Sequence, residues 1–115
     1  MVKRKSEYLV DKNENMRGGQ GVVTIEHFLT PSEMHDKGRL FAKITVKPGD
    51  SIGFHVHEKE MEAFYIVSGE AEMSDNGEIV VLSAGDTLLT KPGEGHSVKS
   101  VGKEALEMIA LIVFE

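Results

Sequence analysis

Turn-forming residues interrupt this chain so often that no long element of secondary structure fits between them. Twelve glycines and three prolines are spread over 115 residues. The stretches between them are short and rich in apolar and β-branched side chains. A turn every ten or so residues (about 8 to 12) is typical of an all-β sandwich or barrel. Helix has little support, and residues 31–38 alone are expected to form a single helical turn or a loop.

Nine segments have the composition of strands. Turn sequences separate them, among them Pro48-Gly49-Asp50 and Asp75-Asn76-Gly77. The Asn-Gly pair is a strong signal for a two-residue hairpin loop, because both residues tolerate positive φ. The predicted strands are 22–29, 40–46, 52–57, 62–68, 70–74, 78–82, 87–90, 96–101 and 105–114.

The length of 115 residues is that of a single domain with one hydrophobic core. Residues 1–20 are predicted to form an N-terminal arm, because the segment before about residue 17 is polar. The run Gly18-Gly19-Gln20-Gly21 that follows is interpreted as a flexible entry into the ordered body.

Charge and composition exclude several classes of function. Thirteen basic and nineteen acidic residues give a net charge of −6, which argues against nucleic acid or an anionic membrane as a partner. The absence of cysteine excludes disulfides, thiol catalysis and cysteine-ligated metal sites. The longest apolar run, Met108 to Phe114, is too short to span a bilayer. With no secretory signal visible, we predict a cytoplasmic protein.

Alternation predicts which side chains face the interior. In residues 40–47, Lys43 and Lys47 must face water, so the intervening apolar residues point inward. The same reasoning in the other strands predicts an apolar interior formed by Leu40, Ala42, Ile44, Val46, Phe64, Ile66 and Val98.

Three histidines and one glutamate are placed to form a metal site. His55 and His57 are two residues apart and therefore lie on one face of their strand. Glu62 begins the following strand, and His96 points inward in a distant strand because Lys99 points outward. Three imidazoles and a carboxylate suit divalent iron, manganese, nickel, copper or zinc. Such a set leaves coordination positions open, as catalytic and ligand-binding sites do.

The same residues carry a resemblance to the cupin family. The first cupin motif, G-x5-H-x-H-x3,4-E-x6-G, is matched by Gly49, His55, His57, Glu62 and Gly69. The second, G-x5-P-x-G-x2-H-x3-N, is matched by Gly85, Gly93 and His96, with Lys91 and Ser100 at its proline and asparagine positions. The resemblance covers about residues 39–114. It implies a double-stranded β-helix (jelly-roll) barrel that holds a metal through His55, His57, Glu62 and His96.

The remaining histidines and acidic residues near the ligands are predicted to have other roles. His27 is expected to be a packed or edge histidine, and His35 to be solvated in a loop. Glu58 and Glu60 belong to a turn expected to be exposed, and either would replace Glu62 as a ligand only if the strand pairing slipped.

The resemblance implies a small metalloenzyme, dioxygenase-like, decarboxylase-like or an isomerase, that acts on a small chelating organic acid or carbonyl compound. The alternative is a non-catalytic module that binds a small ligand or metal. Glu94 and Asp50 are weak candidates for a general acid or base. Arg39 is the only arginine in the barrel region, since Arg4 and Arg17 lie in the arm, and none is expected to point inward. Chelation is therefore expected to hold the substrate.

The last strand predicts association with a second subunit. Residues 105–114 are apolar on both faces, so something must cover the outer one. The N-terminal arm or a second copy of the chain would serve, and a homodimer is the prediction.

Overall fold

A computed structural model describes all residues 1–115 and contains ten strands and two short 3₁₀ helices. The helices are η1 (Lys5–Glu7) and η2 (Met16–Gly18). The strands are β1 (Leu9–Glu14), β2 (Val22–Leu29), β3 (Gly38–Val46), β4 (Ser51–Val56), β5 (Glu60–Ser68), β6 (Glu70–Asp75), β7 (Glu78–Ser83), β8 (Thr87–Thr90), β9 (Gly95–Ser100) and β10 (Leu106–Phe114). No helix is long and apolar enough to cross a membrane.

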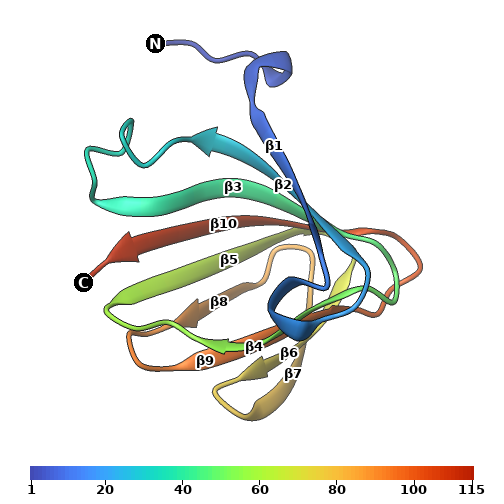
Figure 1. Cartoon of the computed structure of the whole chain (residues 1–115). Helices are drawn as coiled ribbons and strands as arrows, with labels where there is room; N and C mark the ends of the chain where they lie inside the picture. The colour runs from blue at the N-terminus through green and yellow to red at the C-terminus, as the bar shows by residue number, and fades with distance from the viewer.

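The strands form two antiparallel sheets that face each other as a jelly roll (Figure 1). The larger sheet has the order β1-β2-β3-β10-β5-β8, and the smaller has the order β4-β9-β6-β7. From β3 to β10 the chain crosses between the sheets after every strand except β6, which pairs with β7 in the smaller sheet, so β4 and β5 lie on opposite sides of the interior. This crossing brings residues near position 55 opposite residues near position 62.

The all-β prediction is confirmed, and each of the nine predicted strands is present with its ends displaced by at most two residues. The turn between β6 and β7 has positive φ at Asn76 (50°) and Gly77 (99°), as a two-residue hairpin loop requires. The segment 31–36 between β2 and β3 forms turns rather than a strand or a regular helix.

The N-terminal segment is more regular than its polar composition predicts. Residues Leu9–Glu14 form β1, which pairs antiparallel with β2, from Leu9 opposite His27 to Glu14 opposite Val22. This strand lacks an apolar face because it is at the edge of the sheet, where almost all its side chains are exposed. Backbone hydrogen bonds to β2 are enough to order it, and hydrophobic alternation does not report such bonds.

The core lies between the two sheets and confirms the predicted inward faces. Ala42, Ile44 and Val46 of β3 are buried, and Leu40 packs partly buried against them. Phe64, Ile66 and Val98 are also buried. The interior contains few buried polar side chains, which are His57, Glu62, Thr90, His96 and Ser100. A buried polar group is costly unless it is satisfied, so this cluster marks the part of the interior that packing alone does not explain.

Candidate metal centre

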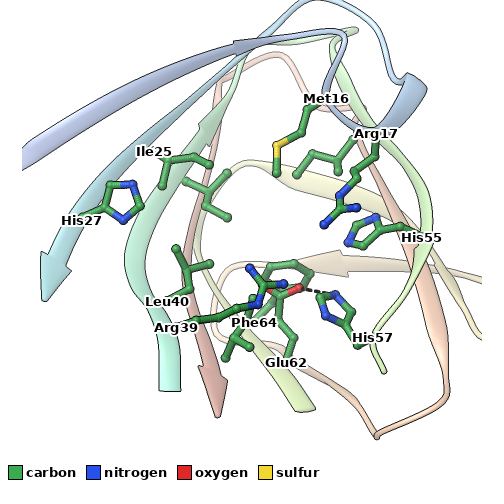
Figure 2. Close-up of a pocket in the computed structure, with 13 residues that line it drawn as sticks. Met16, Arg17, Ile25, His27, Arg39, Leu40, His55, His57, Glu62 and Phe64 are labelled. Atoms are coloured by element: carbon green, nitrogen blue, oxygen red, sulfur yellow. Dashed lines mark ion pairs between the residues drawn. The ribbon is translucent and has the colours of Figure 1, made fainter. Parts of the chain in front are cut away.

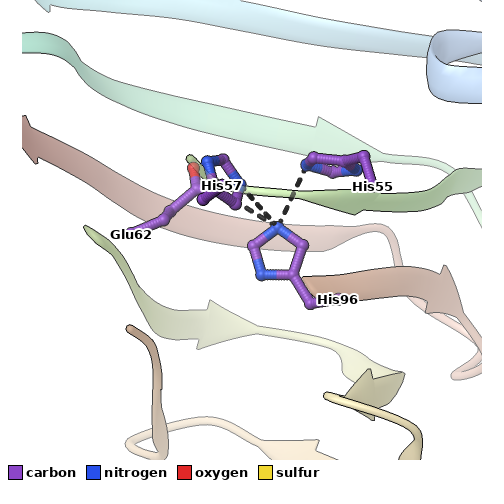
Figure 3. A group of neighbouring side chains, drawn as sticks. All are labelled: His55, His57, Glu62 and His96. Atoms are coloured by element: carbon purple, nitrogen blue, oxygen red, sulfur yellow. Dashed lines mark hydrogen bonds and ion pairs between the residues drawn. The ribbon is translucent and has the colours of Figure 1, made fainter. Parts of the chain in front are cut away.

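The four predicted ligands converge between the two sheets (Figure 3). His55 belongs to β4, His57 follows its last residue, and His96 of β9 is directly opposite His55 in the strand pairing. Glu62 comes from β5 in the other sheet. One ligand atom from each of the four side chains lies within 4.8 Å of the others. The spacing of two residues between the histidines and the crossing from β4 to β5 produce this convergence.

The ligand atoms surround one small space. Nε2 of His96 is 3.2 Å from Nε2 of His57 and 3.2 Å from Nε2 of His55. Oε1 of Glu62 is 3.0 Å from Nε2 of both His57 and His96. Three nitrogens and one oxygen therefore point at a common centre.

The other nitrogen of each imidazole has its own partner. Nδ1 of His55 donates to the carbonyl oxygen of Gly53 at 2.8 Å. Nδ1 of His57 donates to Glu60 at 2.9 Å, and Nδ1 of His96 lies 2.7 Å from the hydroxyl oxygen of Thr90. The Gly53 carbonyl and the Glu60 carboxylate are acceptors and favour the hydrogen on Nδ1 of His55 and His57, and the Thr90 hydroxyl, which can accept or donate, is compatible with the same arrangement in His96. With the hydrogens on Nδ1, the Nε2 lone pairs are free for a metal. Lone pairs directed at one another at this distance repel unless a cation lies between them, so the donor set fits a divalent transition metal.

Without a metal, Glu62 accepts hydrogen bonds from Nε2 of His57 and His96, so a proton takes the place of the cation. The pKa of Glu62 is lowered overall: burial acts to raise it, but hydrogen bonds from His57 and His96 outweigh that effect. The pKa of His57 is raised, chiefly by its hydrogen bond to Glu62. Burial lowers the pKa of His55. Glu62 is therefore an anion at neutral pH, and a metal ion would replace the proton that His57 otherwise attracts.

Glu60 does not lie in an exposed turn, contrary to the sequence expectation. It begins β5, and its two carboxylate oxygens share one bifurcated hydrogen bond from Nε of Arg39, at 2.9 and 3.0 Å. One of them also accepts a hydrogen bond from Nδ1 of His57. The pKa of Glu60 is lowered because hydrogen bonds from Arg39 and His57 outweigh the raising effect of burial. The carboxylate thus orients His57 rather than competing with Glu62. Its partner Arg39 is on β3, so no local sequence signal could reveal this role.

A cavity of about 190 Å³ opens above the ligands (Figure 2). His55, His57 and Glu62 form part of its wall, whereas His96 is fully buried outside its lining. The apolar part of the wall consists of Met16, Ile25, Leu40, Ile44, Ile52, Phe64 and Ile112. The volume is below the roughly 300 Å³ at which pockets for drug-sized ligands begin, so the pocket suits a molecule of few atoms.

Two arginines line this cavity, and the expectation of a pocket without arginine is wrong. Arg17 comes from η2 and Arg39 from the start of β3, and Figure 2 shows both side chains reaching into the pocket. Arg17 was misplaced because the N-terminal segment folds back onto β4, a contact between distant parts of the chain. The one sequence feature connected with this contact is Gly19. It was interpreted as part of a flexible entry, but it is a glycine because it packs closely against the backbone of Ser51.

The two weak candidates for acid–base roles have other contacts. The carboxylate of Asp50 accepts a hydrogen bond from the backbone N–H of Val22 at 3.3 Å. The carboxylate of Glu94 accepts one from the backbone N–H of Lys91 at 3.0 Å, within the turn before β9. Neither residue lines the cavity.

The two histidines outside the cluster differ from each other. His35 is exposed in the turn region before β3, as expected. His27 is partly buried at the edge pairing of β2 with β1, where Nε2 lies 2.8 Å from the carboxylate of Asp11. It also lines the cavity, on the side away from the metal ligands (Figure 2).

The chain is similar to known proteins in both sequence and structure. The family model for the cupin domain matches residues 42–114. An oxalate-binding protein of Thermotoga maritima is 45% identical over 113 residues, which cover 98% of this chain and 93% of the relative. A crystal structure described as a predicted oxalate decarboxylase from Thermotoga maritima superposes with a TM-score of 0.95 at 44% identity, over 100% of both chains.

A more distant neighbour supports the fold alone. The cupin domain of Schizosaccharomyces pombe Cnp3 superposes with a TM-score of 0.75 at 12% identity, over 91% of this chain and 69% of that one. The two cupin motifs of the sequence contain the positions of all four ligands. A cupin assignment on these motifs agrees with the family model, with the 45% identical relative and with the two facing sheets. The chain therefore belongs to the cupin family, as a small cupin with a jelly-roll fold.

Proposed function

We propose that His55, His57, Glu62 and His96 bind one divalent transition metal ion. The observation that carries this proposal is the convergence of three Nε2 atoms whose Nδ1 atoms already have partners. Nitrogen and oxygen ligands of this kind serve iron, manganese, nickel, copper and zinc. A bound ion would supply a Lewis-acid centre with coordination positions that face the cavity.

The ligand that we propose is a small organic acid that chelates the metal, such as oxalate. The cavity of about 190 Å³ admits only a small molecule, and the arginines in its wall favour an anion. A relative with 45% identity is named an oxalate-binding protein, which supports this ligand class.

Metal-dependent binding of this acid is the function that the site supports best. Decarboxylation and isomerisation need a proton donor or acceptor near the reacting carbon. Glu62, assigned to the metal, is the only carboxylate that lines the cavity. The remaining imidazole, His27, lies on the side away from the ligands (Figure 2).

A metalloenzyme is the second candidate. The apolar wall of the cavity excludes water from one side of the proposed metal, a condition that suits a metal-centred oxidation of dioxygenase type. This candidate predicts consumption of the acid or of oxygen by the loaded protein, whereas a binding protein returns the acid unchanged.

Metal analysis followed by calorimetry tests the proposal. Protein reconstituted with Mn²⁺ and then dialysed is expected to retain close to one equivalent of metal and to bind oxalate, whereas metal-free protein should not bind it. Retention of less than ~0.2 equivalents of every transition metal tested would contradict the metal site. Oxygen uptake and chromatography of the acid after incubation then separate binding from turnover.

We also propose that the chain forms a homodimer through the outer face of the larger sheet. Ile109, Leu111 and Val113 are only partly buried there, beside Tyr65 and Val67, which are exposed. The N-terminal segment does not cover them, because β1 extends the sheet beyond β2 instead. Light scattering at micromolar concentration tests this, and a clean monomer would refute it.

A further inference from the structure

Arg17 has a backbone conformation that is unfavourable for a residue with a side chain. Its φ of 55° and ψ of 29° lie in the left-handed region, in the middle of η2. Asn15, two residues before it, is also left-handed, with φ of 49°. Strained residues persist where the surrounding structure determines them, and they are concentrated at ligand sites. The strained backbone indicates a functional role for the Arg17 side chain.

Close backbone contacts hold this turn against β4. A Cβ atom at Gly53 would overlap the carbonyl oxygen of Arg17, and one at Gly19 would overlap the carbonyl oxygen of Ser51. The backbone N–H of Ser51 donates to the carbonyl of Gln20 at 2.9 Å, and the backbone N–H of Gln20 donates to the hydroxyl of Ser51 at 2.9 Å. The turn that carries Arg17 is thus anchored to the strand that carries His55.

The two arginines of the cavity are in different electrostatic situations. Arg39 is neutralised by Glu60, with a shortest N–O distance of 2.8 Å. Arg17 has no carboxylate within ion-pair distance and no side-chain hydrogen bond, although the chain has an excess of acidic residues. The cavity therefore has one uncompensated cation, beside the proposed metal.

We propose that Arg17 is the specificity-determining residue of this pocket: its guanidinium pairs with the carboxylate oxygens that the metal leaves free on a chelating ligand. This inference rests on the proposed function of the site. It assigns the ligand class as small dicarboxylate dianions, and it disfavours diketones, catechols and monoacids of similar size. A planar guanidinium matches a carboxylate with two parallel hydrogen bonds, which a lysine ammonium does not.

The test compares oxalate with oxamate, in which one carboxylate is replaced by a carboxamide of the same shape. Calorimetry measures both dissociation constants for Mn²⁺-loaded wild type, Arg17→Met, Arg17→Lys and the control Lys12→Met. Lys12 is an exposed cation of β1, so its removal changes the net charge equally without altering the cavity. Metal content and the thermal midpoint are measured for each protein.

We expect Arg17→Met to weaken oxalate binding by about 10- to 100-fold and oxamate binding much less, because a charge-assisted pair is lost. Arg17→Lys should recover part of the preference, and Lys12→Met should match wild type. Metal content should be the same in all four. Arg17→Gly, which relieves the left-handed φ, should bind oxalate as weakly as Arg17→Met without a fall in thermal midpoint.

The outcomes separate this inference from the proposed function. Wild type that binds neither acid when loaded with metal would overturn the proposed function and the inference together. The role of Arg17 alone would be overturned if wild type binds oxalate and Arg17→Met binds it equally well. It would also be overturned if the affinities of Arg17→Met for oxalate and oxamate fall in the same proportion.

Discussion

Two parts of the pocket wall differ in burial, in charge pairing and in backbone conformation. The metal wall, formed by β4 and β5 with His96 of β9 buried behind it, carries ligands that are buried or partly buried. Each of its imidazoles has a hydrogen-bond partner for its second nitrogen. The turn wall, formed by η2, carries a cation that is largely exposed, has no partner and is in a strained backbone. The difference means that the proposed metal ligands and the proposed anion-pairing arginine lie in separate parts of the chain. Each should therefore respond to its own substitutions.

The largest expected effect is loss of the metal on changing a residue of the metal wall. His96→Ala removes a fully buried ligand and should lower metal affinity by more than about 100-fold. Metal content after dialysis measures the effect, and circular dichroism checks that the sheets persist. His35→Ala, an exposed histidine away from the cavity, is the control. Equal losses in the two variants would contradict the ligand assignment.

A smaller effect is expected for the residue that orients His57. Glu60→Gln weakens the hydrogen bond to Nδ1 and the ion pair with Arg39, and should lower metal affinity by about 10- to 100-fold. Competition with a coloured chelator measures this change. Glu58→Gln, at an exposed position two residues before Glu60, should leave the affinity unchanged. A Glu60 variant with normal affinity would show that the carboxylate is only a support for Arg39.

A backbone change should disturb the turn wall more than the metal wall. Gly53→Ala places a methyl group on the Arg17 carbonyl and must displace η2. We expect oxalate affinity to fall about tenfold, with a smaller change in metal content, measured by calorimetry on Mn²⁺-loaded protein. Gly102→Ala is the control, because its nearest neighbours are 3.3 Å or more from the added atom, far from the pocket. A loss of metal as large as the loss of oxalate would mean that the two walls are not independent.

The smallest expected effect is a difference in how the walls respond to pH. Since the pKa of His57 is raised above 6.5, protons should begin to displace the metal at a higher pH than at an ordinary histidine. Metal affinity should thus fall as pH drops from about 8 to about 6. A guanidinium–carboxylate ion pair does not depend on pH in this interval, so the affinity of fully loaded protein for oxalate should stay constant. A parallel fall in both affinities would contradict the division between the walls.

Local chemistry made the strands and the metal ligands predictable, and the resemblance to the cupin motifs implied the jelly-roll barrel. Strand positions followed from turn residues such as Asn76-Gly77, and the inward faces followed from the period of two that placed Lys43 outside. His55 and His57 share a face for the same reason. These inferences depend on neighbours in sequence, where the backbone has few alternatives. The cytoplasmic location, the homodimer and the acid–base roles of Glu94 and Asp50 stay predictions from sequence.

The sequence by itself determined the all-β fold and the four residues that face one another at the proposed metal centre. Only the tertiary structure decided the rest of the pocket: that the polar N-terminal segment adds β1 to the sheet, that Glu60 holds His57, and that Arg17 reaches the cavity. The reason is physical. Each of these depends on a backbone contact or a charge pair between segments far apart in the chain, and such contacts leave no periodic trace in composition or spacing.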